Sequence, residues 1–138
     1  MITFKTEIRV RYADTDQMGI VYNGKYLEYF EVGRTELLRN FGLAYKTVED
    51  EGYMLPLIET GLKFKKPAVY DDLLEVEAKV EKLISPTVHI EYKIFRKVDN
   101  ELLTEGFTTH VFTRKSDNKP SRPPGFYIDK LKEHFEEK

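Results

Sequence analysis

The residues best placed to do chemistry are three consecutive polar side chains, Asp14-Thr15-Asp16. They follow a predicted strand and precede a predicted helix by about one turn. The start of a helix presents free N–H groups and the positive end of the helix dipole. A carboxylate beside such donors can act as a base or a nucleophile while the donors stabilise an oxyanion. Gly19 would let the backbone approach a ligand closely. The arrangement points to acyl transfer; the alternative is an ordinary turn, in which Asp and Thr bond to nearby backbone.

A second unusual position is Arg34, which falls inside the apolar stripe of the predicted helix, beside Phe30 and Leu37. Charges at such positions are normally paired. The simpler interpretation is therefore a structural ion pair with Glu31, three residues earlier. The other interpretation is contact with a ligand.

Several kinds of site are excluded or disfavoured by the residues that the chain has. There is no cysteine, and 22 basic residues stand against 24 acidic ones, a net charge of −2. That balance disfavours a nucleic-acid partner. The histidines, His89, His110 and His134, are dispersed, so we expect no metal site. The sequence contains no nucleophile elbow, P-loop or dinucleotide fingerprint, and we expect no metal or redox cofactor.

The elements that would position these residues are one strand and one long helix. Apolar and polar residues alternate over 4–12, which predicts a half-buried strand. Apolar residues recur every three or four positions over 24–41, which predicts a helix. Asn23 is its predicted N-cap and Gly42 its predicted stop. Gly33, in the middle of the apolar stripe, suggests close packing against another element.

The rest of the chain alternates between strands and short turns. We predict a short helix over 44–51 and strands over 62–65, 74–81, 88–94 and 102–113. A polar loop over 115–124 and a short helix over 128–135 follow. Short turns imply antiparallel pairing. The 138 residues thus predict a single α+β domain spanning 1–138, with one helix covering one curved sheet, and exposed edge strands favour an oligomer.

The location of the protein is a matter of expectation from sequence. No apolar run approaches the ~18 residues of a membrane-spanning helix. The first residues lack the basic and apolar segments of a signal peptide. We therefore expect a cytoplasmic protein with no membrane span.

Three segments resemble a known family. RYADTDQMGIVYN over 11–23, YLEYFEVGRTELL over 26–38 and KPAVYDD over 66–72 are similar to motifs of the hotdog-fold acyl-CoA thioesterases. The type is that of 4-hydroxybenzoyl-CoA thioesterase, and the nearest match is its YbgC-like subgroup. The resemblance extends over about residues 6–113.

The resemblance implies a hotdog fold, in which a curved antiparallel sheet of about five strands wraps around one long central helix. It implies homodimers, often paired into homotetramers, with active sites at the dimer interface. Asp16 would be the catalytic nucleophile or general base, and the backbone N–H of Asn23 the oxyanion donor. The reaction would release a free carboxylic acid and CoA from an acyl-CoA substrate.

Two departures from the family pattern affect the expected site. Many subgroup members have His at the position of Asn23, but a backbone donor is unaffected by that change. The turn over 83–86 lacks the basic residues that some members use for CoA phosphates, so Lys65 and Lys66 become the candidates. The expected substrate-binding residues are Gly19, Val21, Tyr22, Lys65 and Lys66, and the helix and residues 53–64 should line the acyl pocket.

Two other functions remain open on the sequence alone. One is hydrolysis of thioesters of acyl carrier protein, and the other is a non-catalytic module that binds acyl-CoA. A hotdog dehydratase would need a catalytic histidine motif, His-Phe-Pro or Asp-x-Asn-Pro-x-His, and neither occurs in this chain.

Overall fold

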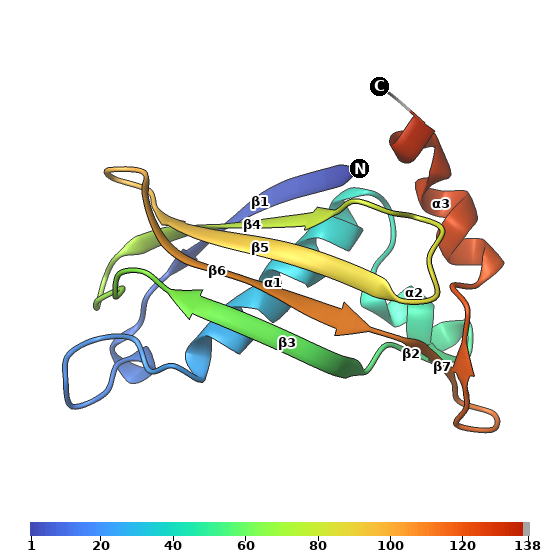
Figure 1. Ribbon diagram of the computed structural model, residues 1–138, viewed down its shortest axis with the longest axis horizontal. Coiled ribbons are helices and arrows are strands. Elements are labelled where there is room, and N and C mark those ends of the chain that lie inside the picture. Colours follow the sequence, from blue (N-terminus) through green and yellow to red (C-terminus); the bar gives the residue numbers. More distant parts are fainter. Residues whose placement is uncertain (137–138) are drawn as a thin grey trace.

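A five-stranded antiparallel sheet packed on one long helix, α1, forms most of the protein (Figure 1). The computed structural model describes residues 1–136. The strands lie in the order β1-β4-β5-β6-β3. Their bounds are β1 Ile2–Arg9, β3 Leu57–Phe64, β4 Leu73–Val80, β5 Val88–Arg96 and β6 Glu101–His110, and α1 spans Lys25–Asn40. This arrangement confirms the α+β class and the curved antiparallel sheet around one helix.

Strand β4 shows why the alternation in the sequence was informative. Leu74, Val76, Ala78 and Val80 are fully buried, while the residues between them lie on the other face. Side chains on a strand point alternately to opposite faces, so one face can pack on α1 while the other stays polar. The first strand, by contrast, begins earlier than predicted, at Ile2, and ends earlier, at Arg9, because a 3₁₀ turn, η1 (Tyr12–Asp14), follows it.

Helix α1 buries the predicted apolar stripe, but its start differs from the prediction. The helix begins at Lys25 with Gly24 as the N-cap residue, and no side chain caps it. The predicted cap by Asn23 is therefore wrong. The first turn is closed by backbone instead, because the N–H of Lys25 donates to the carbonyl of Tyr22 at 2.9 Å. Gly42 ends the helix as predicted, with a φ of +88° that L side chains rarely adopt.

Two glycines let α1 lie close to the sheet. A Cβ atom on Gly33 would lie 2.8 Å from the Cγ1 atom of Val76 on β4. A Cβ atom on Gly106 of β6 would lie 2.8 Å from the Cε2 atom of Phe30. The Phe30 ring stacks on Tyr92 of β5 with centroids 4.2 Å apart. The close packing predicted from Gly33 is confirmed, and the sheet supplies the second glycine.

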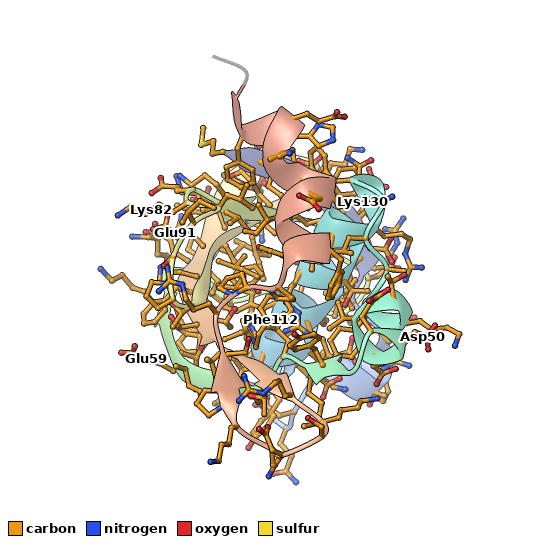
Figure 2. The ribbon with its side chains drawn as sticks, turned by 90° about the vertical axis from the view of Figure 1, so that its right-hand side faces the viewer. Asp50, Glu59, Lys82, Glu91, Phe112 and Lys130 are labelled. Atoms are coloured by element: carbon orange, nitrogen blue, oxygen red, sulfur yellow. The ribbon has the colours of Figure 1, made fainter. Side chains whose placement is uncertain are left out.

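The remaining elements close one end of the sheet. They are α2 Tyr45–Asp50, β2 Tyr53–Met54, β7 Phe112–Arg114, β8 Pro120–Ser121 and α3 Gly125–Glu136. Strands β2, β7 and β8 form a second small sheet that was not predicted. The predicted strand over 102–113 breaks at Val111, where the chain passes from one sheet to the other. Figure 2 looks onto this end, with α3 in front and Phe112 near the centre.

The described helices do not include one long and apolar enough to cross a membrane. The cytoplasmic location stays a prediction.

Candidate active site

The loop between β1 and α1 is anchored by a buried carboxylate, Asp14. Its Oδ2 atom accepts hydrogen bonds from the Tyr29 hydroxyl at 2.9 Å and from the Arg11 N–H at 3.1 Å. Lys25 lies 3.6 Å from its Oδ1 atom. Burial opposes ionisation, but these hydrogen bonds and the Arg11 charge outweigh it and hold the pKa of Asp14 below its ordinary value. Asp14 thus fixes the base of the loop to the first turns of α1.

Asp16 lies two residues beyond this anchor, in a tight turn. The Gly19 N–H donates to the Asp16 carbonyl at 2.9 Å, and the Met18 N–H donates to its Oδ1 atom at 2.9 Å. Gly19 has a φ of +79°, which the turn requires. The Asp16 side chain is half-buried. Within residues 1–136, its Oδ2 atom accepts no hydrogen bond from another protein group. One carboxylate oxygen is therefore held by backbone and the other is available.

Backbone N–H groups that could serve as oxyanion donors lie at the start of α1. Across the described part of the chain, the backbone N–H groups of Asn23 and Gly24 have no hydrogen-bond acceptor. The next two, of Lys25 and Tyr26, donate to the carbonyls of Tyr22 and Asn23. The unused donors lie at the positive end of a 16-residue helix. Such N–H groups can accept charge that develops on a carbonyl oxygen.

A hollow of about 210 Å³ lies beside these donors and contains four of the predicted site residues. Val21, Asn23, Lys65 and Lys66 line it, together with Tyr26 and Phe64 among others. Val21 is itself buried, and its N–H donates to the carbonyl of Ala68. Asp16, Gly19 and Tyr22 do not line the hollow, and the Tyr22 ring is exposed. The structure therefore brings together part of the predicted set.

The two candidate phosphate ligands are held in ion pairs. Lys65 lies 3.1 Å from Glu105, and Lys66 lies 3.4 Å from Glu101. All four side chains are more than a third exposed. Exposed pairs contribute only about 0–1 kcal/mol each, so either lysine can exchange its carboxylate for a phosphate at little cost.

A cluster that the sequence interpretation did not find lies further along α1. His110 and Thr108 are buried on β6, and Arg34 faces them from the helix. Among residues 1–136, no carboxylate lies within 4.0 Å of the Arg34 guanidinium, so the predicted ion pair with Glu31 is not formed. The available signal was the i, i+2 spacing of Thr108 and His110, which places both on one face of a strand. That signal gives no information about the partner on α1.

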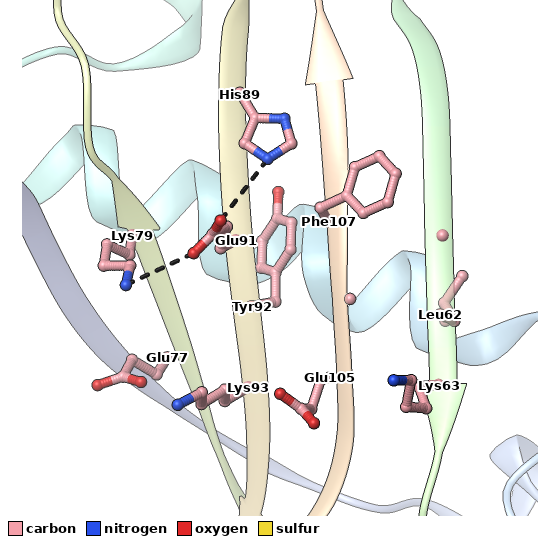
Figure 3. A pocket seen from close by; sticks show the side chains of 12 residues that line it. Leu62, Lys63, Glu77, Lys79, His89, Glu91, Tyr92, Lys93, Glu105 and Phe107 are labelled. Atoms are coloured by element: carbon pink, nitrogen blue, oxygen red, sulfur yellow. Dashed lines mark ion pairs between the residues drawn. The ribbon is translucent and has the colours of Figure 1, made fainter.

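Another hollow, of about 480 Å³, lies on the sheet face turned away from α1 (Figure 3). Its charged side chains form ion pairs across the strands, as Lys79 does with Glu91 at 3.5 Å. Neither Asp16 nor Asn23 lines it. Over the residues that the structure describes, there is no group of three or more acidic or histidine side chains arranged for a metal ion.

Comparison with known proteins identifies the family. The profile of the Thioesterase-like superfamily matches residues 10–135. A putative acyl-CoA thioesterase, YneP of Bacillus subtilis, is 36% identical over 116 residues, covering 84% of this chain and 83% of YneP. The acyl-CoA thioesterase YbgC of Haemophilus influenzae is 35% identical over 109 residues, covering 78% of each chain.

A solved structure agrees with these sequence matches. The DHNA-CoA thioesterase of Staphylococcus aureus superimposes with a TM-score of 0.89 and is 32% identical, covering 97% of this chain and 89% of that one. This likeness confirms the hotdog fold. This chain belongs to the Thioesterase-like superfamily.

Proposed function

We propose that this protein hydrolyses acyl-CoA thioesters to a free carboxylic acid and CoA, with Asp16 and the Asn23 N–H as its catalytic groups. The observation that carries the proposal is the pair of unused N–H groups at the start of α1. They follow a loop whose carboxylate, Asp16, keeps one oxygen without a hydrogen-bond partner among residues 1–136. The relatives named as acyl-CoA thioesterases support the substrate class.

The proposed reaction needs little beyond these two groups. Asp16 either attacks the thioester carbonyl or takes a proton from the water that attacks it. The carbonyl oxygen becomes negatively charged and accepts a hydrogen bond from the Asn23 N–H. The C–S bond then breaks and releases CoA as a thiolate. Because thiols have pKa values of about 8.5, the thiolate leaves without a strong general acid. If Asp16 is the nucleophile, water then hydrolyses the acyl anhydride.

Lys65 and Lys66 bind the nucleotide phosphates of CoA in this proposal. They line the same hollow as Asn23, and their ion pairs with Glu105 and Glu101 are exposed. The backbone at Gly19 and Val21 shapes the site near the thioester, and Tyr22 contributes an exposed ring there. In this proposal the acyl group occupies a hollow that Leu27 and Arg34 line from α1 and that Leu55 and Leu57 line from the other side.

The protein acts as a homodimer built along β3. Within residues 1–136, β3 pairs with β6 on one side and with no strand on the other. Leu57, Ile58 and Phe64 of this strand are 46%, 57% and 48% exposed, which is unusual for large apolar side chains. Edge strands of this kind favour pairing with another chain. Light scattering of the purified protein would give the dimer mass, or a tetramer if dimers pair further.

The test of the activity is thiol release from a panel of short, long and aromatic acyl-CoAs. The Asp16→Asn variant should lower kcat at least about a hundredfold, because a positioned carboxylate contributes about 10²–10⁴. Asp50→Asn, which changes an exposed carboxylate on α2, is the matched control and should be unchanged. Near-normal turnover by a folded Asp16→Asn variant would overturn the assignment. Release only from acyl carrier protein thioesters would replace CoA as the carrier, and no release from either would favour a binding module.

A further inference from the structure

The two unused N–H groups, of Asn23 and Gly24, belong to a segment that no side chain caps. Helix α1 begins at Lys25 with Gly24 as its N-cap residue, and no side-chain cap is formed. An uncapped first turn frays readily, because its N–H groups have no partner inside the helix. Glycine at the N-cap adds further freedom to the backbone. A contact from outside the helix is therefore needed if these N–H groups are to keep a fixed direction.

The backbone of Ala68 makes two such contacts, one on each side of the unused groups. Its carbonyl accepts a 2.9 Å hydrogen bond from the Val21 N–H, two residues before Asn23. Its N–H donates to the hydroxyl of Tyr26, three residues after Asn23, across 3.4 Å. Within residues 1–136, the Ala68 N–H has no other acceptor. One fully buried residue thus binds both ends of the segment that carries the unused donors.

Ala68 is itself fixed to the main sheet. It lies in the connection between β3 and β4, and this connection is bonded to the sheet on both sides of Ala68. On one side, the Lys65 N–H donates to the carbonyl of Leu103 on β6 at 2.8 Å. On the other side, the Asp71 N–H donates to the carbonyl of Val10, next to the end of β1, at 3.0 Å. The contacts of Ala68 therefore tie the start of α1 to the sheet.

The Tyr26 side chain is held firmly enough to make this tie effective. Its ring is almost fully buried and meets two other rings edge to face. The ring centroids lie 5.2 Å from that of Phe64 and 5.8 Å from that of Tyr29. Burial raises the pKa of Tyr26, so the hydroxyl stays neutral and its oxygen accepts from the Ala68 N–H. The hydroxyl thus joins the second residue of α1 to the connection between β3 and β4.

We propose that Tyr26 is a positioning residue for hydrolysis: its hydroxyl, through the Ala68 backbone, keeps the Asn23 N–H directed at the thioester carbonyl. This inference rests on the proposed thioesterase function. Tyr26 itself transfers no proton and forms no bond to the carbonyl oxygen. Without the hydroxyl, the bond from Val21 to Ala68 would hold the segment at one end only. The donors would then still be present, but they would be less well ordered.

Two other roles for this hydroxyl must be distinguished, because Tyr26 also lines the hollow beside Asn23. A purely structural hydroxyl contributes to folding stability and leaves the turnover of the folded protein unchanged. A general acid would donate a proton to the leaving thiolate, and its loss would lower kcat without changing the bonds to the carbonyl oxygen. A positioning hydroxyl changes the bond between the Asn23 N–H and that oxygen, and this bond can be observed directly.

The kinetic arm compares Tyr26→Phe with the unmodified protein on the acyl-CoA that the latter cleaves best. The substitution keeps the ring and its packing, so the variant should fold. Deleting an oxyanion donor costs about 10²–10³ in kcat, and a displaced donor should cost less, so we expect kcat to fall about tenfold. KM should change by less than about twofold, because the donor acts mainly on charge that develops after binding. Tyr127→Phe, at an equally buried tyrosine of α3, should leave both constants unchanged.

The spectroscopic arm measures the carbonyl stretch of a bound, isotope-labelled acyl-CoA by infrared difference spectroscopy. It uses the Asp16→Asn background, in which the ester is not consumed. A hydrogen bond to a carbonyl oxygen lowers its stretching frequency. Adding Tyr26→Phe should therefore raise the frequency, because a less ordered Asn23 N–H donates a weaker bond, and adding Tyr127→Phe should not. An unmoved band, or an unchanged kcat in Tyr26→Phe, would overturn the inference.

If no thioester is cleaved, the proposed function fails separately, and the positioning role is tested without substrate. Amide relaxation by NMR gives the order parameters of the Asn23 and Gly24 N–H groups. In the unmodified protein both should lie near the value of about 0.85 for rigid backbone. Tyr26→Phe should lower both toward about 0.6, and Tyr127→Phe should not change them. A lowered order in Tyr26→Phe alone would support the positioning role, and unchanged order parameters would overturn it.

Discussion

The hydroxyl of Tyr29, on the second turn of α1, donates a 2.9 Å hydrogen bond to the buried carboxylate of Asp14. Both side chains are almost fully buried, at 5% and 2% exposure. The bond joins the helix that carries the unused N–H groups to the loop that carries Asp16. The two halves of the proposed catalytic pair are thereby held to one another through a contact that takes no part in the reaction.

Tyr29→Phe should lower the free energy of unfolding at pH 7 by about 1.5–3 kcal/mol, the range for a hydrogen bond to a charged group. Asp14 has a pKa below its ordinary value of 3.8 in the folded protein. The stability that it contributes is therefore present above that value and lost as the pH falls through the folded pKa. Urea unfolding at pH 7 and pH 3 should show the difference between the two proteins shrinking at low pH. Tyr12→Phe changes an exposed ring and should leave the free energy of unfolding unchanged. If Tyr29→Phe differed from the unmodified protein by the same amount at both pH values, the assignment would be contradicted.

His110 should make the protein less stable in mild acid. Its pKa is lowered from 6.5 to about 4, first by burial and then by the Arg34 charge. Between these values the unfolded chain binds a proton that the folded protein does not, so stability falls as the pH falls from 6.5 to 4. His110→Asn, which can still donate to the Leu55 carbonyl, should flatten this slope in urea titrations. His89→Asn, at an exposed histidine, should keep the slope, and an unchanged slope in His110→Asn would refute the explanation.

Gly33→Ala should destabilise the protein although alanine is the better helix former. The new Cβ atom would lie 2.8 Å from the Cγ1 atom of Val76, which is fully buried and cannot move aside. Overpacking by one methyl typically costs about 1–3 kcal/mol, against about 1 kcal/mol gained from helix propensity. In a Val76→Ala background the clash is removed, and the same substitution should stabilise by about 1 kcal/mol. A double-mutant cycle by urea unfolding measures the change of sign, and additive effects would exclude the clash.

Lys93→Glu tests a row of alternating charges that crosses all five strands. In register, the row consists of Lys5, Glu77, Lys93, Glu105 and Lys63. Four of its members are visible side by side in Figure 3. The substitution places three acidic side chains next to one another. It should lower the free energy of unfolding by about 1 kcal/mol in low salt, because like charges directly opposite on a sheet repel. The loss should shrink in 1 M salt, whereas Lys93→Gln should show a smaller loss with little salt dependence. Equal losses for the two variants would mean that charge is not the cause.

The parts of the fold that were predictable are those with a local signal. The alternation over 74–80 and the three-and-four spacing from Tyr26 to Leu38 are visible in the sequence because each follows from the geometry of one element. Gly33 indicated close packing because a glycine inside an apolar stripe is otherwise unfavourable. The small sheet and the break at Val111 gave no such signal, since they depend on which strands meet.

Some features of the candidate site could likewise be predicted from the sequence, and others could not. Asp16 and Asn23 were predicted by motif, and Lys65 and Lys66 because the turn over 83–86 lacks basic residues. Asn23 and the two lysines do line one hollow. The bond from Tyr29 to Asp14 and the contact from Arg34 to His110 join residues 15 and 76 positions apart. Their partners lie on other elements, so neither helix spacing nor strand spacing indicates them. The error at Asn23 has a local cause, because the carbonyl of Tyr22 closes the first turn that a side-chain cap would have served.

Gly106 has an effect that reaches well beyond its own strand. With only hydrogen at this position, the ring of Phe30 lies against the sheet, and the carbonyl of Gly61 lies 2.5 Å from where a Cβ atom would be. Any larger residue at position 106 would displace the whole of α1 away from the sheet. The loop with Asp16 is also tied, by the hydrogen bond from the Val21 N–H to the Ala68 carbonyl, to the segment between β3 and β4 and would not follow the full displacement. A single methyl group at the centre of the core would thus change the distance between the Asp16 carboxylate and the Asn23 N–H at the start of α1.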